Sequence, residues 1–187
     1  AQAKLVPLTG QADDLDELIS ILRKATAAPV TLVDPRAHLD SQVMKALRAT
    51  HFFDIAKAQS IGITVLVFPL DDLDVMMNID AVCRFCGNDV DYVIVRNPAR
   101  APKTRMFDGS ELEKELLGLH AGSLTLPVLS ECVKLRLAKL ETDQQRGIPF
   151  NEAVGNDALG LDIMARGVLQ DWLCTLFVQY DRIAAKL

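Results

Sequence analysis

Short apolar runs that end in a polar residue or a proline recur along the chain and predict the strands of a sheet. The clearest run covers residues 90–95 and stops at Arg96-Asn97-Pro98, because proline cannot donate a hydrogen bond to a neighbouring strand. A continuous apolar run of this kind is typical of a strand that is buried on both faces. Similar runs predict further strands at residues 3–6, 30–34, 63–68 and 123–126.

Between these runs, apolar residues recur at the spacing of amphipathic helices. Ser110 and Glu113 have the spacing of a capping box and predict a helix start. Aspartates at 71, 72 and 74 predict another, since acidic side chains favour the positive end of the helix dipole. We expect helices at about 13–26, 40–50, 52–59, 71–85, 110–119, 129–140 and 149–153, and a long amphipathic helix at about 161–185.

The alternation of strands and helices predicts the fold class. It favours a single α/β domain over residues 1–187, a three-layer sandwich in which a mostly parallel sheet is flanked by helices. Right-handed crossovers bring the carboxyl ends of all the strands to one edge of the sheet, and ligands of open α/β sheets bind at that edge. We therefore expect Asp34, Asn97 and Pro127, which stand at or just after predicted strand ends, to lie on a common edge.

Composition and charge narrow the class of protein only a little. Half of the residues are hydrophobic and the formal net charge is −5, which argues against a dominant nucleic-acid-binding surface. No apolar run has the length of a membrane span, and no signal peptide is evident. The four cysteines lack the spacing of a disulfide framework. We expect a cytoplasmic protein.

Three strand-end sequences, LVDPRA, VIVRNP and LTLP, occur in an order that resembles the deviant P-loop ATPases of the ParA/MinD type, above all their plasmid stability and mobilisation subgroup. The sequence PFNEA before the last long helix adds to the likeness, which extends from about Leu15 onward. The resemblance implies a P-loop NTPase-like fold, ATP and Mg²⁺ as cofactors, and ATP hydrolysis. It also implies a homodimer that acts with a partner protein in plasmid or DNA partitioning.

The resemblance also assigns roles to single residues. Asp34 resembles the Walker B aspartate, which makes it the candidate for catalysis and for the metal. Asn97 resembles the asparagine that contacts the base, and Pro127 resembles the proline that borders it. Arg96 is a further candidate for nucleotide binding. In the family one residue separates the aspartate from a proline, whereas here Pro35 follows Asp34 directly.

The phosphate-binding loop of that family has no counterpart in the sequence. Such a loop needs clustered glycines, whose backbone N–H groups surround the phosphates, and a lysine that contacts them. Gly10 and Gly62 stand alone. In the family this loop precedes everything found here, so we expect that an upstream segment was removed, omitted or replaced, either by residues 3–6 or by a partner chain. We expect this chain alone to be inactive as an ATPase.

Each candidate residue also has an interpretation without a ligand. Asp34 could cap a helix or start a turn, and Asn97 could close a side-chain turn before Pro98. The basic residues from Arg96 to Arg105 could belong to a solvated loop. For the whole chain, the alternative is a non-catalytic interaction domain that uses its long last helix to bind a partner.

Cys83 and Cys86 form a lone Cys-x-x-Cys within a predicted helix. A zinc site would require a second pair or histidines at suitable spacing. We therefore expect buried, unreactive thiols here.

Overall fold

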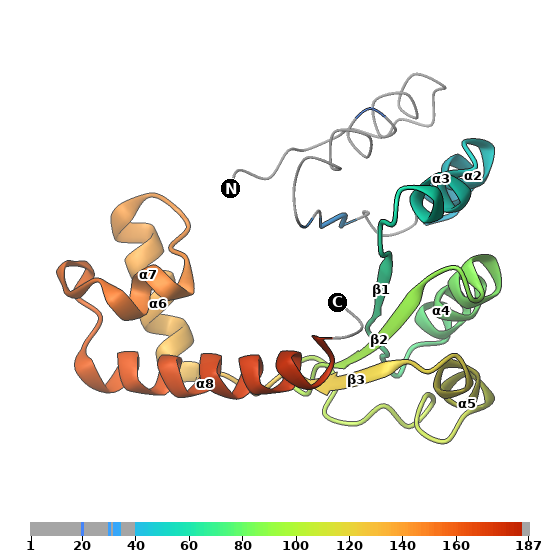
Figure 1. Ribbon diagram of the computed structural model, residues 1–187. Coiled ribbons are helices and arrows are strands. Elements are labelled where there is room, and N and C mark those ends of the chain that lie inside the picture. Colours follow the sequence, from blue (N-terminus) through green and yellow to red (C-terminus); the bar gives the residue numbers. More distant parts are fainter. Residues whose placement is uncertain (1–19, 21–29, 31, 35–39, 185–187) are drawn as a thin grey trace.

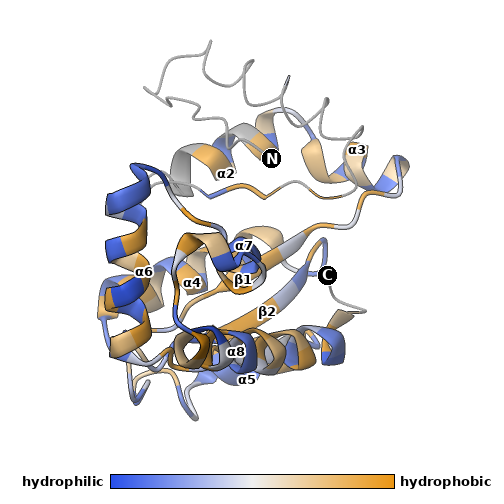
Figure 2. Cartoon of the chain, turned by 90° about the vertical axis from the view of Figure 1, so that its left-hand side faces the viewer, coloured by the Kyte–Doolittle hydropathy of each residue, from blue (hydrophilic) through white to orange (hydrophobic). Residues whose placement is uncertain are grey.

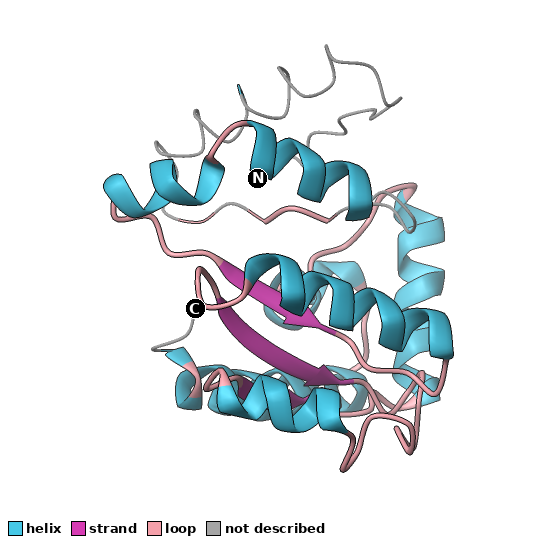
Figure 3. Ribbon diagram, turned by 90° about the vertical axis from the view of Figure 1, so that its right-hand side faces the viewer, coloured by secondary structure: helices cyan, strands magenta, loops and turns pink. Residues whose placement is uncertain are grey.

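The computed structural model of the protein describes residues 20, 30, 32–34 and 40–184. At its centre lies a parallel sheet with the strand order β1 (Thr64–Val67), β2 (Asp91–Arg96) and β3 (Gly122–Thr125). Figure 3 shows β1 and β2 pointing the same way, toward the loops at one edge of the molecule. The structure is thus an α/β fold with helices flanking a parallel sheet, as the alternating pattern predicted.

The central strand β2 is the most deeply buried element among the described residues. Tyr92, Val93 and Ile94 have no exposed surface, because β2 has a strand on either side and packed side chains on both faces. The Tyr92 hydroxyl donates to the carbonyl oxygen of Gly87 at 3.1 Å, which satisfies the polar atom of this buried ring. In Figure 2, β1 and β2 run through the interior largely in the hydrophobic colours, whereas the outer helix α6 shows many hydrophilic residues.

Helices α4 (Leu73–Cys86) and α5 (Glu111–Gly118) connect successive strands and pack on the same face of the sheet (Figure 1). This follows from the strand order. Each right-handed crossover leads to the next strand in the same direction across the sheet, so both connecting helices lie on the same face of the sheet. Cys83 of α4 and Leu116 of α5 meet Tyr92 and Ile94 in the main hydrophobic cluster. Helices α2 (Asp40–Ala49) and α3 (Phe52–Ala58) precede β1, and Phe53 of α3 packs against Phe85 of α4.

The C-terminal part of the long helix α8 (Ile163–Arg182) adjoins the opposite face of the sheet, where Tyr180 and Ile183 pack near Val93 and Val95. The helix also protects the outer edge of β3. Gln179 Nε2 donates to the Thr125 carbonyl at 2.6 Å, and Thr125 N–H donates to Gln179 Oε1 at 2.7 Å. A side-chain amide thus takes the place of a neighbouring strand at this otherwise open edge.

A separate hydrophobic cluster joins the N-terminal half of α8 to the preceding helices. Val133 and Leu137 of the first of these helices pack with Ala165 and Leu169 of α8. The elements involved are α6 (Glu131–Gln144), α7 (Phe150–Gly155) and the 3₁₀ helix η1 (Asp157–Leu159). Helix α8 therefore contributes to two clusters, one in this helical unit and one on the sheet.

One prediction in the N-terminal third differs from the structure, and two others lie almost entirely outside the described residues. The strand predicted at 30–34 is wrong for Val30, Leu32, Val33 and Asp34, which have no regular secondary structure. An apolar run becomes a strand only when it joins a hydrogen-bonded ladder and packs on its neighbours; Val30 and Leu32 remain about 80% exposed. The predicted strand at 3–6 lies outside the described residues, as does nearly all of the predicted helix at 13–26.

The other predicted elements are present, with ends shifted by a few residues. Helix α6 continues to Gln144, beyond the predicted end near residue 140, and α8 ends at Arg182. None of the helices in the described part of the chain combines the length and the apolar character that crossing a membrane requires.

Candidate functional site

The carboxyl ends of β2 and β3 lie side by side and form the candidate site. Arg96 and Thr125 are partners in the ladder, and Leu126 N–H donates to the Arg96 carbonyl oxygen at 2.8 Å. Asn97 follows β2 directly, and Pro127 stands two residues after the end of β3, so the predicted common edge is confirmed for this pair. Asp34 is exposed and does not follow a strand, so no strand end delivers it to this edge.

An open depression of about 580 Å³ lies at this edge. The strand ends supply Arg96 and Thr125 to its lining. The loop after β2 supplies the remaining lining residues, which are Pro98, Ala101, Pro102, Lys103, Thr104, Arg105 and Asp108. Lys103 and Arg105 are exposed, and neither forms an ion pair with another described residue. The depression therefore presents two cations to solvent, which suits an anionic group.

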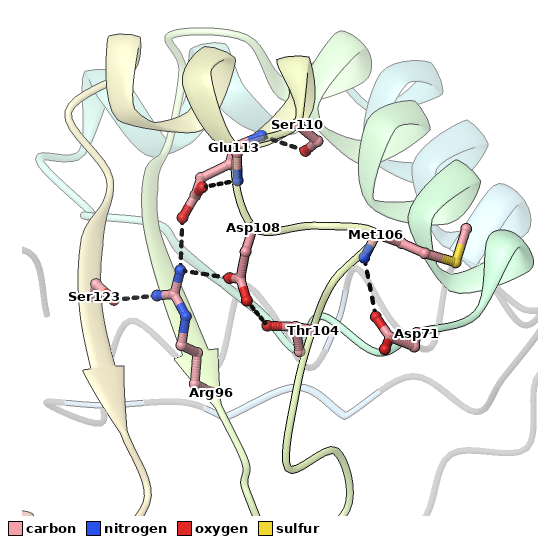
Figure 4. A network of polar contacts seen from close by, with 9 residues as sticks. Asp71, Arg96, Thr104, Met106, Asp108, Ser110, Glu113 and Ser123 are labelled. Carbon is pink, nitrogen blue, oxygen red and sulfur yellow. Dashed lines mark hydrogen bonds and ion pairs between the residues drawn. The ribbon is translucent and has the colours of Figure 1, made fainter.

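Arg96 is held in a network of polar contacts (Figure 4). Its Nη2 donates to Glu113 Oε1 at 2.6 Å and to Asp108 Oδ1 at 3.3 Å, and its Nη1 donates to Ser123 Oγ at 2.8 Å. Its guanidinium also lies 5.7 Å from the ring centroid of the buried Phe107. These contacts occupy both terminal nitrogens, so in this structure Arg96 joins β2 to α5 and to the loop.

The same network shapes the loop that lines the depression. Thr104 Oγ1 donates to Asp108 Oδ2 at 2.8 Å, and Met106 N–H donates to Asp71 Oδ1 at 3.0 Å (Figure 4). Thr104 is 5% exposed and Phe107 is fully buried, so the loop is attached to the core at two points. Lys103 and Arg105 flank Thr104 and are thereby held on a constrained segment.

The backbone of Asn97, and not its side chain, closes the turn after β2. Its carbonyl oxygen accepts hydrogen bonds from the N–H groups of Arg100 at 3.0 Å and Ala101 at 2.9 Å. Within the part of the chain that the structure describes, no residue hydrogen-bonds to the Asn97 amide. The side-chain turn that is the alternative interpretation of Asn97 is therefore not formed, and no described residue occupies the donors or the acceptor of this half-buried amide.

Pro127 is fixed by the last helix. Its carbonyl oxygen accepts a hydrogen bond from Trp172 Nε1 of α8, and the Trp172 ring meets Phe150 of α7 edge to face at 5.5 Å. The segment after β3 is therefore attached to the helical unit, which sets the direction of the chain at this side of the site.

The capping interactions show what sequence reasoning found and what it missed. Ser110 Oγ accepts from Glu113 N–H at 3.2 Å, as the capping box predicted. The Glu113 carboxylate, however, accepts from Gly109 N–H at 2.7 Å and pairs with Arg96. The capping pattern was the only sequence signal at Glu113. Nothing in the local spacing indicated that Asp108, Glu113 and Ser123 converge on Arg96.

The described residues do not supply the metal and phosphate half of a Mg²⁺–ATP site. Among them there is no group of three His, Cys, Asp or Glu side chains that could hold a metal ion. Gly109, which follows the lining residue Asp108, donates its N–H to Glu113 and so cannot offer it to a phosphate. Asp34 is exposed in a segment without regular structure. A triphosphate and its metal would need ligands beyond these residues.

Cys83 and Cys86 are buried in the main cluster, as expected. Burial raises the pKa of the Cys83 thiol to about 12 and that of the Cys86 thiol to about 11. A protonated thiol is a poor nucleophile and a poor metal ligand, and both side chains of the Cys-x-x-Cys pack as part of the core.

We expect only Cys132 and Cys174, which are exposed, to react with a thiol reagent such as DTNB in the native protein at pH 8. Cys83 and Cys86 should react only after denaturation, because they stay inaccessible and protonated at that pH. Labelling followed by peptide mass spectrometry measures this. Equal labelling rates at all four thiols in the native state would contradict the expectation.

Comparisons of the chain with protein-family models, with curated proteins and with solved structures found no match. The site is therefore characterised by its own geometry.

Proposed function

We propose that this chain forms the base-binding side of a ParA/MinD-like ATPase site, whose phosphate-binding loop lies outside these residues. One observation carries the proposal. The adjacent ends of β2 and β3 bring to one edge Pro127 and the Asn97 amide, which no described residue hydrogen-bonds, beside an open depression that presents Lys103 and Arg105. An amide that can donate and accept suits the edge of a purine ring.

Within this proposal, Asn97 and Pro127 hold the base, Arg96 positions the loop that borders the nucleotide, and Asp34 supports Mg²⁺ or the attacking water once a phosphate loop is present. Mg²⁺ would supply charge neutralisation of the phosphates. The chain alone would not hydrolyse ATP. The complete protein would act in the cytoplasm as a homodimer, in plasmid or DNA partitioning or mobilisation together with a partner protein.

A second candidate function is a non-catalytic interaction domain that has the fold without the nucleotide site. It is favoured by two observations: the described residues lack a metal-ligand cluster, and large apolar side chains are exposed on α8. A parallel sheet with helices hosts many functions, so the fold suits either candidate.

A thermal-shift measurement with Mg²⁺–ATP separates the two candidates, because a ligand that binds only the native state raises its stability. We expect little or no change in the Tm of this chain, and a rise for the full gene product if that product carries a phosphate loop. In the latter, Asn97→Ala should weaken ATP binding about three- to tenfold, the effect of one hydrogen bond.

Asn78→Ala is the matched control, since Asn78 is exposed within α4 and belongs to neither strand end. It should leave ATP affinity unchanged. Unchanged Tm of the full gene product with Mg²⁺–ATP would exclude the ATPase and support the interaction domain. Equal ATP affinity of the Asn97→Ala and Asn78→Ala variants would remove Asn97 from the site.

A further inference from the structure

Three cations without an ion-pair partner stand close together on the loop between β2 and α5. Arg100, Lys103 and Arg105 are exposed, and their side chains form no hydrogen bond or ion pair with another described residue. Many cations on the helices are paired instead, as Arg84 is with Asp80. In a chain with a formal net charge of −5, unpaired cations that gather on one loop indicate a surface for an anion.

Two of these three cations border the same depression. Lys103 and Arg105 line the hollow of about 580 Å³ at the ends of β2 and β3, whereas Arg100 does not. Thr125 lines it from the end of β3. Gln179 binds the backbone N–H and carbonyl groups of Thr125, but no described residue hydrogen-bonds its exposed hydroxyl. An ammonium, a guanidinium and a hydroxyl can thus donate to one ligand.

The acidic side chains nearby are engaged with other groups. Asp108 is the one acid among the lining residues. Its Oδ1 accepts from Arg96 Nη2 at 3.3 Å, and its Oδ2 accepts from Thr104 Oγ1 at 2.8 Å. Asp71 contacts the loop at the Met106 N–H and does not line the depression (Figure 4). Neither carboxylate pairs with the two free cations of the lining, which therefore keep their charge for a ligand.

The loop holds these cations in a constrained conformation. Pro98 and Pro102 fix two of its φ angles, and the Asn97 carbonyl oxygen accepts hydrogen bonds from two N–H groups of the turn. Thr104, which stands between the two cations, is 5% exposed and donates to Asp108. A ligand that binds a constrained loop spends little free energy on ordering it.

We propose that this depression binds the phosphate group of a small ligand. A phosphate monoester presents three acceptor oxygens and about two negative charges at neutral pH, and Lys103, Arg105 and Thr125 offer donors to them. A carboxylate presents only two oxygens and one charge. Hydrogen bonds from a lysine and an arginine to an anion are stronger than neutral ones, so these two residues supply most of the affinity.

The size and the lining of the depression indicate the rest of the ligand. Its volume of about 580 Å³ lies within the range of roughly 300–1,000 Å³ for small-molecule sites and is larger than one phosphate group needs. Pro98, Ala101 and Pro102 supply apolar walls. The ligand therefore carries its phosphate on a larger, partly apolar body. Asn97 and Pro127 are not among the lining residues, so this site does not rest on the proposed nucleotide function.

An NMR titration of the isotope-labelled chain with inorganic phosphate, without nucleotide or Mg²⁺, tests the site. Sodium chloride keeps the ionic strength constant. We expect saturable shifts of the amide signals of residues 103–105 and 125, with a dissociation constant of about 1–10 mM, because the open site leaves the anion partly in water. The absence of saturable shifts at these residues up to about 100 mM phosphate would overturn the proposal.

Single substitutions test which cations bind. Lys103→Gln and Arg105→Gln should each raise the dissociation constant about fivefold or more, since each removes a charge-assisted contact. Arg100→Gln is the matched control, because Arg100 is an exposed, unpaired cation of the same loop that does not line the depression. Its effect should stay below about twofold. Circular dichroism verifies that each variant is folded, and equal effects of Arg105→Gln and Arg100→Gln would overturn the proposal.

Three further probes test the chemistry of the ligand. Phenyl phosphate should bind more tightly than inorganic phosphate, because its ring can contact the apolar walls; equal or weaker binding would overturn the larger ligand. Acetate should give no saturable shifts, and saturation equal to that of phosphate would overturn the assignment to phosphate. A single-stranded oligonucleotide should bind no more tightly than phenyl phosphate. Tighter binding that Arg100→Gln and Arg105→Gln weaken equally would replace the small-ligand site by a nucleic-acid surface.

Discussion

Replacing Ile94 by alanine is expected to lower the free energy of unfolding by about 4 kcal/mol, the upper part of the range for removing a large aliphatic side chain from a core. Ile94 has no exposed surface and lies on the central strand, where it packs in the main cluster with side chains from α4 and α5. A strand with a neighbour on both sides cannot move to fill the cavity, so the loss includes the cavity as well as the transfer term.

Urea unfolding followed by circular dichroism measures this change. Leu73→Ala is the control, since Leu73 is 62% exposed at the start of α4 and its truncation should change the unfolding free energy by less than about 0.5 kcal/mol. If both variants lose the same amount, β2 is not the centre of the core and the arrangement of the site loses its support.

Replacing Arg96 by methionine is expected to lower the free energy of unfolding by about 2 kcal/mol, because Glu113 and Asp108 would keep their charges without a cationic partner. The side chains of Arg96 and Glu113 are only 27% and 18% exposed, so water can replace the lost contacts only in part. The loss should appear in the absence of any ligand. Hydrogen exchange should also become faster at residues 104–110, whose loop depends on this network.

Arg84→Met is the matched control, because Arg84 pairs with Asp80 on the surface of α4 and is 74% exposed. Its effect should be below about 0.5 kcal/mol. A double-mutant cycle between Arg96→Met and Glu113→Gln should give a coupling of about 1 kcal/mol or more, as expected for residues in one network. A coupling near zero, or equal losses for the two arginine variants, would show that the network does not hold the loop.

The predicted positions of the three strand-end residues have different outcomes, and the geometry of the sheet explains why. Asn97 and Pro127 follow strands that are hydrogen-bonded neighbours. The strand ends inferred from the sequence therefore predicted correctly that these two residues lie on one edge. Asp34 follows an apolar run whose described residues do not enter the sheet, so the predicted strand is wrong there and the place of Asp34 at this edge stays a prediction. Whether a run pairs with a neighbour depends on the rest of the fold and is not visible in the run itself.

The amino-acid sequence by itself determined the local elements of this protein: the buried strand near residues 90–95, the helix starts at Ser110 and at the aspartates 71, 72 and 74, and the parallel α/β class. These depend on the spacing of apolar residues and on capping side chains a few positions apart, which any segment carries within itself. Only the tertiary structure decided that Arg96 meets Asp108, Glu113 and Ser123, that Gln179 closes the edge of β3, and that α8 leaves an apolar side uncovered. Each of these features depends on how segments that are distant in the sequence pack against one another. No local pattern in the sequence encodes that packing.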